Sequence, residues 1–342
     1  MTAYIFKIIT LLGGLALFLF GMDIMGKALE RQAGGKLQTI LAKMSSNVFK
    51  GFLLGLGVTA VIQSSSATTV MVVGFVNSGI MTLKQAVGVI MGSNIGTTVT
   101  AWILSLSGLE GDSFLIKFFK PSTLAPLIGI FGILLYMGKN EKRKGIGTIC
   151  LGFMALMTGM DLMSSSMSFL KTESWFADLM ISFTNPILGI LFGAVLTAII
   201  QSSSASVGIL QGLCATGAVT IGTALPIILG QNIGTCVTAL LASVGAHANA
   251  KRVAAIHLSL NVIGTAVLLS LYTAGRALFE FALGETAIDA FGIAIVHTIF
   301  NIAITVILMP FGKWIIKLAT VMVRDDKKSE EKFAQSQKRK NV

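Results

Sequence analysis

The amino-acid sequence predicts an all-α integral membrane protein made of two inverted-topology repeats and one extra C-terminal span. Each repeat is expected to contain a re-entrant helical hairpin and a broken helix. The first observation is composition: of 342 residues, 54% are hydrophobic and only 12% are charged, whereas soluble domains carry roughly 25% charged residues. The second is a set of long charge-free segments. The third is a group of polar blocks that recurs at one fixed spacing.

Three segments contain no Asp, Glu, Lys or Arg: residues 51–83, 85–109 and 179–250. Each exceeds the roughly 20 residues that a helix needs to cross a hydrocarbon core. The regular alternation of short transmembrane strands is absent from the sequence, so a helical bundle is favoured over a β-barrel.

The polar blocks indicate a duplication. The run Gln-Ser-Ser-Ser-Ala at residues 63–67 returns at 201–205. The run Gly-Ser-Asn-Ile-Gly-Thr at 92–97 returns as Gly-Gln-Asn-Ile-Gly-Thr at 230–235. Both are displaced by 138 residues, and a third block, Gly-Met-Asp, keeps the same offset. One offset across three blocks indicates a repeated structural unit.

The segments follow in a simple order. The first repeat is predicted over residues 4–137, the second over 145–274, an additional transmembrane helix over 286–316 and a basic cytoplasmic tail over 317–342. The apolar run at 8–25 continues into the first repeat, so it is interpreted as a true span rather than a cleaved signal. Each repeat is expected to hold a span, a hairpin at the serine block, a segment with the Asn-Ile-Gly block and a closing span.

Loop charges predict the orientation of the two repeats. The connection at residues 27–50 holds five Lys or Arg and one Glu, while its counterpart at 171–178 holds one Lys, one Glu and one Asp. Basic loops of membrane proteins face the cytoplasm, so the repeats are expected to be inverted, with an external N-terminus and a cytoplasmic C-terminus. The same rule accounts for the net charge of +11 without a nucleic-acid partner.

The serine blocks bring a glutamine and three serines to one place among apolar residues. Ser side chains compete for backbone hydrogen bonds and weaken a helix, and a broken helix at membrane depth must be buried or line a watery cavity. A break leaves N–H groups suited to an anion and carbonyl groups suited to a cation. The alternative is that small residues only allow close helix packing, which leaves the glutamines and the duplication unexplained.

The Asn-Ile-Gly-Thr blocks offer amide and hydroxyl oxygens, which hard cations prefer. The candidates are Asn94, Thr97, Asn232 and Thr235. Glycines in the same blocks, such as Gly92, are expected to allow helix unwinding and close approach of a neighbouring backbone. A glycine packing face is the alternative interpretation.

The serine hairpins carry no charge, so a bound anion would be balanced by helix dipoles and by co-bound cations. This argument favours cation coupling. Asp23 and Asp161 are the matched intramembrane carboxylates and are possible coupling residues, with helix capping or a structural hydrogen bond as the alternative.

Histidines offer a different chemistry. The spacing of His257 and Asn261 recurs at His297, where hydrogen bonding between helices is favoured over a proton relay. An intramembrane serine hydrolase would use Ser65 or Ser203 with one of these histidines as base. One activated serine would not require duplication of the whole polar block, so this hypothesis is disfavoured. The three cysteines have no metal-site spacing.

At these paired motifs the chain resembles the sodium/phosphate cotransporter family, over about residues 4–275. The resemblance implies symport of inorganic phosphate with sodium by two inverted hairpins. It implies that phosphate is held by Ser64, Ser65, Ser202 and Ser203. It implies that sodium is held around Gln63, Ser66, Asn94, Thr97, Gln201, Ser204, Asn232 and Thr235. Some animal members carry an acidic residue where this chain has Thr82 and Thr220.

The sequence therefore predicts a non-enzymatic, multi-pass protein of the cytoplasmic membrane that carries phosphate with sodium by alternating access. Sodium is expected as a co-transported ion and no organic cofactor is expected. The expected partners are inorganic phosphate and the lipid bilayer, and the sequence leaves a homo-oligomer open. Another oxyanion as substrate and a passive anion channel are the remaining alternatives.

Overall fold

The computed structural model describes residues 2–44, 47–109, 111, 113–279 and 282–324. Over these residues the chain is helical apart from turns and one antiparallel bridge between Thr220 and Ala287. The first half contains α1 (Thr2–Met44), α2 (Val48–Ile62), α3 (Ser65–Asn77), α4 (Leu83–Ser105), α5 (Phe114–Phe119), α6 (Pro121–Tyr136) and α7 (Glu141–Met167). The second half contains α8 (Ser174–Ser182), α9 (Pro186–Ile200), α10 (Ser203–Leu213), α11 (Ile221–Ala242), α12 (Ala248–Phe279), α13 (Ala290–Leu308) and α14 (Gly312–Met322). Six helices in the described parts are long and apolar enough to cross a membrane, so the all-α membrane class is confirmed.

The helices repeat with the sequence. Helices α2 and α9 begin and end at positions 138 residues apart, and the starts of α3 and α10, and of α4 and α11, keep this offset. Equivalent residues also start α2 and α9: the Asn47 side chain accepts from Lys50 N at 2.8 Å, and the Asn185 side chain accepts from Ile187 N at 3.0 Å. Asparagine caps of this kind satisfy backbone N–H groups at a helix start. The duplication therefore extends to helix boundaries and caps.

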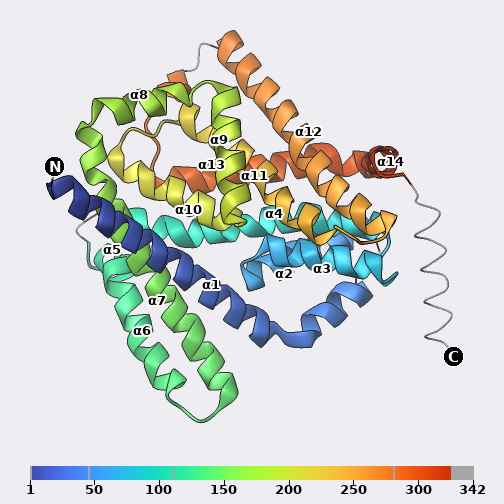
Figure 1. The fold of residues 1–342 in the computed structure, drawn as a ribbon, viewed down its shortest axis with the longest axis horizontal. Helices are drawn as coiled ribbons and strands as arrows, with labels where there is room; N and C mark the ends of the chain where they lie inside the picture. Colours follow the sequence, from blue (N-terminus) through green and yellow to red (C-terminus); the bar gives the residue numbers. More distant parts are fainter. Residues whose placement is uncertain (1, 45–46, 110, 112, 280–281, 325–342) are drawn as a thin grey trace.

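Helix α2 packs along α4, and α9 packs along α11 (Figure 1). Gly92 lies against the carbonyl of Phe52, and the equivalent Gly230 lies against the carbonyl of Ile190. A side chain at either position would overlap that carbonyl, so the expected close approach is confirmed. The expected unwinding is wrong, because α4 and α11 stay helical through both Asn-Ile-Gly blocks. The glycines bring two backbones together without interrupting either helix.

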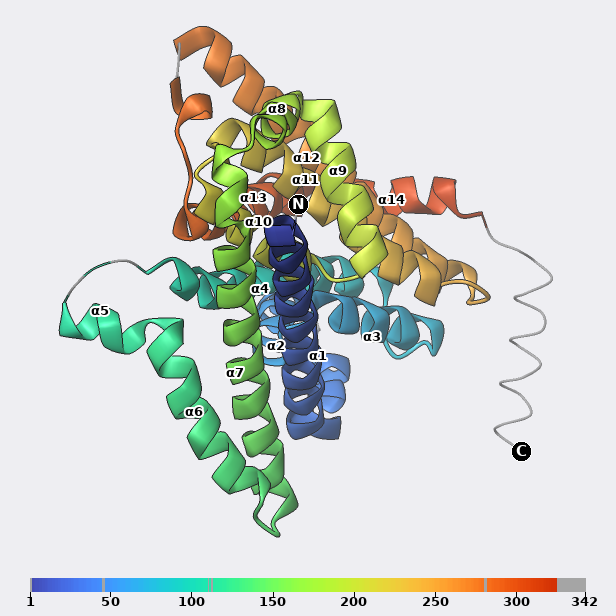
Figure 2. The same cartoon turned by 60° about the vertical axis from the view of Figure 1, so that its left-hand side comes forward.

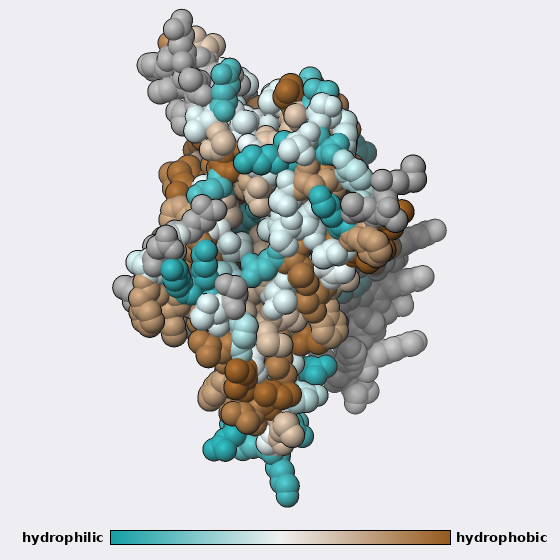
Figure 3. All heavy atoms as spheres, turned by 90° about the vertical axis from the view of Figure 1, so that its left-hand side faces the viewer, coloured by the Kyte–Doolittle hydropathy of each residue, from teal (hydrophilic) through white to brown (hydrophobic). Residues whose placement is uncertain are grey.

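Helices α1 and α7 run side by side (Figure 2), and α6 packs on α7. The α6–α7 turn projects from the rest of the molecule (Figures 1 and 2). In Figure 3, hydrophobic side chains cover the surface above this turn and hydrophilic ones lie at its tip. The exposed apolar residues of α6 include Ile130, Phe131 and Leu134. The apolar surface suits contact with lipid, and the hydrophilic tip suits the polar boundary of the membrane.

The C-terminal helices complete the bundle. Helix α13 packs on α4, and α14 packs on α12. A single turn, Met309–Phe311, separates α13 from α14, and the last span predicted by the sequence falls on this pair. Residues 325–342 of the predicted basic tail lie outside the described residues.

Candidate functional site

Both serine blocks interrupt the helices at the same residue. Gln63 follows α2 with φ 58° and ψ 26°, and Gln201 follows α9 with φ 59° and ψ 22°. Within the described ranges they are the only residues other than glycine with positive φ. A side chain in this left-handed region costs roughly 1–2 kcal/mol. The same cost at both copies makes the two glutamine side chains candidates for a functional role.

Each break is followed at once by a serine-capped helix. Ser64 and Ser202 are extended, with φ −145° and −142°. The Ser64 hydroxyl accepts from Ala67 N at 3.1 Å, and the Ser202 hydroxyl accepts from Ala205 N at 3.2 Å. Side-chain caps of this type fix the first turn of a helix. The sequence therefore starts α3 and α10 at equivalent points, with their N-termini at the breaks.

The two breaks meet at one cavity of about 500 Å³. Its walls are Leu19, Met22, Asp23, Gly26, Lys27 and Glu30 of α1 together with Ile62, Gln63, Ser64, Ile200, Gln201, Ser202 and Ala205. The breaks also touch directly, since the Ser66 hydroxyl donates to the Gln201 carbonyl at 3.4 Å. Residues that are far apart in the sequence therefore form a single site between the two repeats.

The electrostatics of the cavity combine two kinds of group. The N-termini of α3 and α10 both open on it, and each helix N-terminus carries roughly half a positive charge. On the α1 wall, Lys27 bonds Asp23 at 2.8 Å, and both side chains remain more than half exposed. Helix N-termini favour a bound anion, whereas a carboxylate such as that of Asp23 has the oxygen atoms that hard cations prefer.

The two glutamines differ in their surroundings. The Gln63 amide donates to the Ala60 carbonyl and accepts from the Thr100 hydroxyl at 2.8 Å. The Gln201 side chain is exposed at the cavity. Thr100 was not among the residues singled out by the sequence, because nothing in its local pattern distinguishes it from other threonines of the spans.

The other candidates of the serine and Asn-Ile-Gly blocks lie outside the cavity lining, including Ser66 and the buried Ser204. Ser65 and Ser203 are each 4% exposed, and Asn94, Thr97, Asn232 and Thr235 are also buried. None of these six residues lines the cavity. The second hydroxyl of each serine block is therefore placed inside the first helical turn, beneath the surface that Ser64 and Ser202 present.

Asn261, for which the sequence favoured hydrogen bonding between helices, joins the two repeats. The Asn94 amide donates to Asn261 Oδ1 at 3.1 Å, and Asn261 Nδ2 contacts Cys236 Sγ at 3.2 Å. Asn261 thus links α12 to both α4 and α11, as expected of helix-to-helix hydrogen bonding. Its i, i+4 pairing with a histidine was the available signal, but the sequence did not reveal its partner in the first repeat.

The second copy contains buried polar atoms without partners. In the first copy the Thr59 hydroxyl donates to the Thr68 hydroxyl at 2.9 Å. The equivalent hydroxyls of Thr197 and Ser206 have no hydrogen-bond partner in the described structure, although both residues are fully buried. Both polar atoms of the Gln231 amide and Nδ2 of Asn232 share this property. Buried polar groups usually have hydrogen-bond partners, so these atoms are candidate ligands for an ion or a water molecule.

Asp161 does not join this site. It lines a separate cavity with Thr158, Leu162, Ser164, Ser165, Ser168 and Ala215, whereas its equivalent Asp23 lies at the first cavity. The duplicated aspartates therefore occupy different environments. Likewise, neither ring nitrogen of His257 has a hydrogen-bond partner in the described parts, so this histidine does not activate a serine.

Thr82 and Thr220 have structural positions. The Thr82 hydroxyl accepts from Gln85 N at 3.4 Å, and the Thr220 hydroxyl accepts from Thr223 N at 3.3 Å. They cap α4 and α11 at equivalent points, which explains why a short polar residue stands there.

The family model of the Na+/Pi-cotransporters matches the chain twice, over residues 17–165 and 156–297. The chain belongs to the Na+/Pi-cotransporter family. The two matches fall on the two copies of the repeat, and this family consists of phosphate transporters rather than enzymes. The resemblance stated from the paired motifs is thereby confirmed.

Individual members of the Na+/Pi-cotransporter family extend the comparison. The chain is 30% identical over 310 residues to the uncharacterized protein YqeW of Bacillus subtilis, covering 90% of this chain and 95% of that one. It is 27% identical to the putative inorganic phosphate export protein YjbB of Salmonella typhimurium, covering 92% of this chain and 56% of that protein. Over 103 residues, 29% of this chain and 16% of the relative, it is 40% identical to the sodium-dependent phosphate transport protein 2A of Rattus norvegicus. The chain thus spans about half the length of the export protein. No solved structure matches the chain.

Proposed function

We propose that this member of the Na+/Pi-cotransporter family carries inorganic phosphate together with sodium across the cytoplasmic membrane by alternating access. The observation that supports this most is the convergence of two serine-capped helix N-termini on one cavity. Helix N-termini offer backbone N–H donors and positive potential to an anion. Phosphate would lie against Ser64 and Ser202 at the cavity surface, with Ser65 and Ser203 supporting them through the first turn of each helix.

The anion needs a balancing cation, because residues 51–83 and 179–250, which hold the two serine blocks, contain no Lys or Arg, and Lys27 at the cavity is paired with Asp23. Moving one charge against 100 mV costs about 2.3 kcal/mol, so a dianion costs about 4.6 kcal/mol. Two sodium ions moving with phosphate would cancel this cost, and a third would add an electrical driving force for uptake. Coupling to an inward sodium gradient would make import the favoured direction.

Sodium would use oxygen atoms from both copies. At the cavity these are the amides of Gln63 and Gln201 and the carboxylate of Asp23. Outside the cavity lining they are the hydroxyls of Ser66 and Ser204 and the candidates Asn94, Thr97, Asn232 and Thr235. The orphaned hydroxyls of Thr197 and Ser206 support an additional ligand set in the second copy, because hard cations prefer hydroxyl and amide oxygens.

Alternating access would follow from the inversion of the two repeats that the loop charges predict. The cavity described above is bounded by Lys27 of α1, which begins the basic segment 27–50 that the loop charges predict to be cytoplasmic. An inward-facing state with an external N-terminus and a cytoplasmic C-terminus agrees with this placement. Asp161 would take the place of Asp23 when the opposite end opens.

The test is phosphate uptake by purified protein in liposomes, with an inward sodium gradient compared with an equal potassium gradient. We expect accumulation above equilibrium only with sodium. Sodium-independent uptake that stops at equilibrium would instead indicate a passive anion channel. Competition by sulfate or arsenate in the same vesicles measures whether phosphate is the preferred oxyanion.

A further inference from the structure

A second cavity lies between α1 and the α6–α7 turn, outside the site described above. It has a volume of about 620 Å³. Its polar wall is basic: Lys27, Arg31, Lys142 and Lys144 line it, against the single carboxylate of Glu141. Its apolar wall includes Ile24, Ala28 and Tyr136. A cavity of this composition is suited to an amphiphile with an anionic head.

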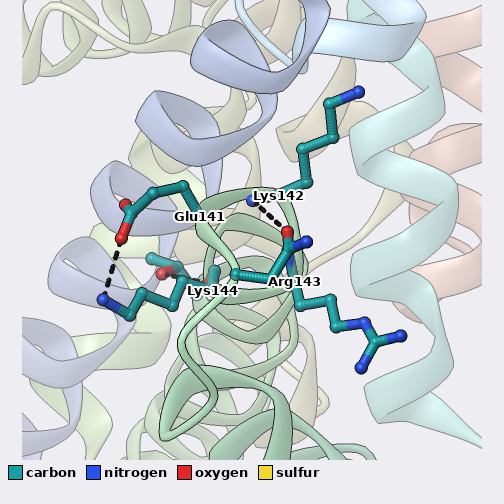
Figure 4. Close-up of polar contacts among 6 residues, drawn as sticks. Glu141, Lys142, Arg143 and Lys144 are labelled. Carbon is teal, nitrogen blue, oxygen red and sulfur yellow. Dashed lines mark hydrogen bonds and ion pairs between the residues drawn. The ribbon is translucent and has the colours of Figure 1, made fainter.

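The basic side chains are only partly neutralised. Lys144 bonds Glu141 at 2.8 Å, and Lys27 bonds Asp23 at 2.8 Å. Figure 4 shows the Lys144–Glu141 pair, with the side chains of Lys142 and Arg143 extending away from it. Among the described residues, neither Arg31 nor Lys142 forms an ion pair with a carboxylate. Two positive charges at this cavity therefore remain available.

The backbone around the cavity is already satisfied and fixed. Asn140 Oδ1 accepts from Lys142 N at 3.0 Å and from Arg143 N at 3.3 Å. The Gln32 amide donates to the Lys142 carbonyl at 2.7 Å and thereby ties α1 to the start of α7. A ligand here would consequently be held by side chains rather than by the N–H groups of α7.

The surroundings distinguish a lipid from a free anion. Tyr136 at the cavity rim is 49% exposed, and the outward face of α6 beside it exposes Ile130, Phe131 and Leu134, the last to 67%. Tyrosine is enriched at membrane interfaces, and basic cavities between membrane helices bind acidic lipid headgroups. Acyl chains could lie along α6 while a phosphate group enters the cavity, whereas a free anion gains nothing from this apolar face.

We propose that the cavity between α1 and the α6–α7 turn binds the headgroup of an anionic phospholipid through Arg31 and Lys142. This binding does not depend on which solute the protein carries. Lys27 lines both this cavity and the cavity between the serine blocks, so the lipid lies next to the α1 wall of the proposed transport site.

The experiment compares lipid binding by the full-length purified protein in nonionic detergent, measured by native mass spectrometry. Phosphatidylglycerol and phosphatidylcholine with identical acyl chains are titrated into the protein. We expect preferential retention of phosphatidylglycerol. Arg31→Gln with Lys142→Gln should weaken this retention by roughly 25-fold, or about 5-fold for each residue, since a basic residue contributes about 1 kcal/mol to binding an acidic surface.

The matched control neutralises two exposed charges at the same turn that do not line the cavity, Lys139→Gln with Arg143→Gln. An equal loss of phosphatidylglycerol retention in both double variants would show that general surface charge, rather than this cavity, attracts the lipid. That result would overturn the proposal. Displacement of phosphatidylglycerol by millimolar inorganic phosphate would assign the cavity to a free anion and would also overturn it. Arg31→Gln alone, which leaves the contact between Gln32 and α7 untouched, provides the same comparison if the double variant fails to fold.

Discussion

Gln63 and Gln201 hold a backbone conformation that glycine would adopt without strain. Replacing Gln201 by glycine separates the side chain from the backbone, because the helix break is preserved while the amide is removed. We expect sodium-dependent phosphate uptake to fall at least about tenfold, the effect of losing roughly 1.4 kcal/mol of ligand contact. The unfolding temperature should stay unchanged or rise, as measured in detergent.

Gln63→Gly is the comparison within the same chain. The Gln63 amide accepts from Thr100 at 2.8 Å, so its removal leaves a buried hydroxyl without its partner and should also lower stability. Unchanged uptake in both glycine variants would remove the glutamines from the proposed ion site.

Thr197 and Thr59 form a second matched pair at the residue scale. Thr59 is hydrogen-bonded to Thr68 at 2.9 Å, whereas the Thr197 hydroxyl has no partner in the described structure. We expect Thr197→Val to raise the sodium concentration for half-maximal uptake about fivefold or more, because it removes a proposed ligand oxygen. The same change should leave the folded state as stable as before, since no protein hydrogen bond is lost.

Thr59→Val should have the opposite profile. It breaks an existing hydrogen bond and should cost about 1 kcal/mol of stability, with a small effect on the sodium dependence. If Thr197→Val behaves in the same way as Thr59→Val, the orphaned hydroxyl marks an internal water or a packing defect rather than a cation ligand.

At the scale of the helix, the N-termini of α3 and α10 are proposed to attract the anion, and Ser202 allows this to be tested directly. Aspartate and asparagine cap a helix about as well as serine, but aspartate adds a negative charge at the cavity. We expect Ser202→Asp to abolish phosphate uptake while the unfolding temperature is preserved. Ser202→Asn, with the same shape and no charge, should retain a measurable fraction of uptake.

Equal uptake by the Asp and Asn variants would show that no anion approaches the start of α10. A loss of stability in both would instead mean that the serine cap has a structural role that neither substitute fulfils.

The sequence predicted these helix starts well because their causes are local. Serine after an apolar run weakens the helix and caps the next one, so the breaks at 63 and 201 follow from nearby residues. The fate of the Asn-Ile-Gly blocks depends on tertiary packing instead. A glycine such as Gly92 is compatible with both an unwound segment and a close helix contact. The contact forms because the Phe52 carbonyl of α2 lies against Gly92. The partnership of Asn94 with Asn261 spans 167 residues and has no local signal.

At the scale of the whole molecule, residues at equivalent positions of the two repeats line different cavities. Asp23 and Asp161 occupy equivalent places in the sequence, yet only Asp23 lines the cavity shared by the serine blocks. An exact two-fold arrangement would place both aspartates at equivalent cavities. The asymmetry is expected of a transporter in one of two states, in which one repeat opens and the other closes.

Gly26 and Ser164 test this interpretation, because they are 138 residues apart and line different cavities. Nothing lies within 4 Å of a side chain placed at Gly26, so Gly26→Cys should fold. With the native cysteines replaced, we expect membrane-impermeant thiol reagents to reach Gly26→Cys from the cytoplasmic side and Ser164→Cys from the outside. Conditions that raise one labelling rate should lower the other, since a shift in population toward one state of the transporter takes it from the opposite state. Labelling rates that rise together, or labelling of both cysteine variants from the same side of the membrane, would contradict the inverted arrangement of the repeats.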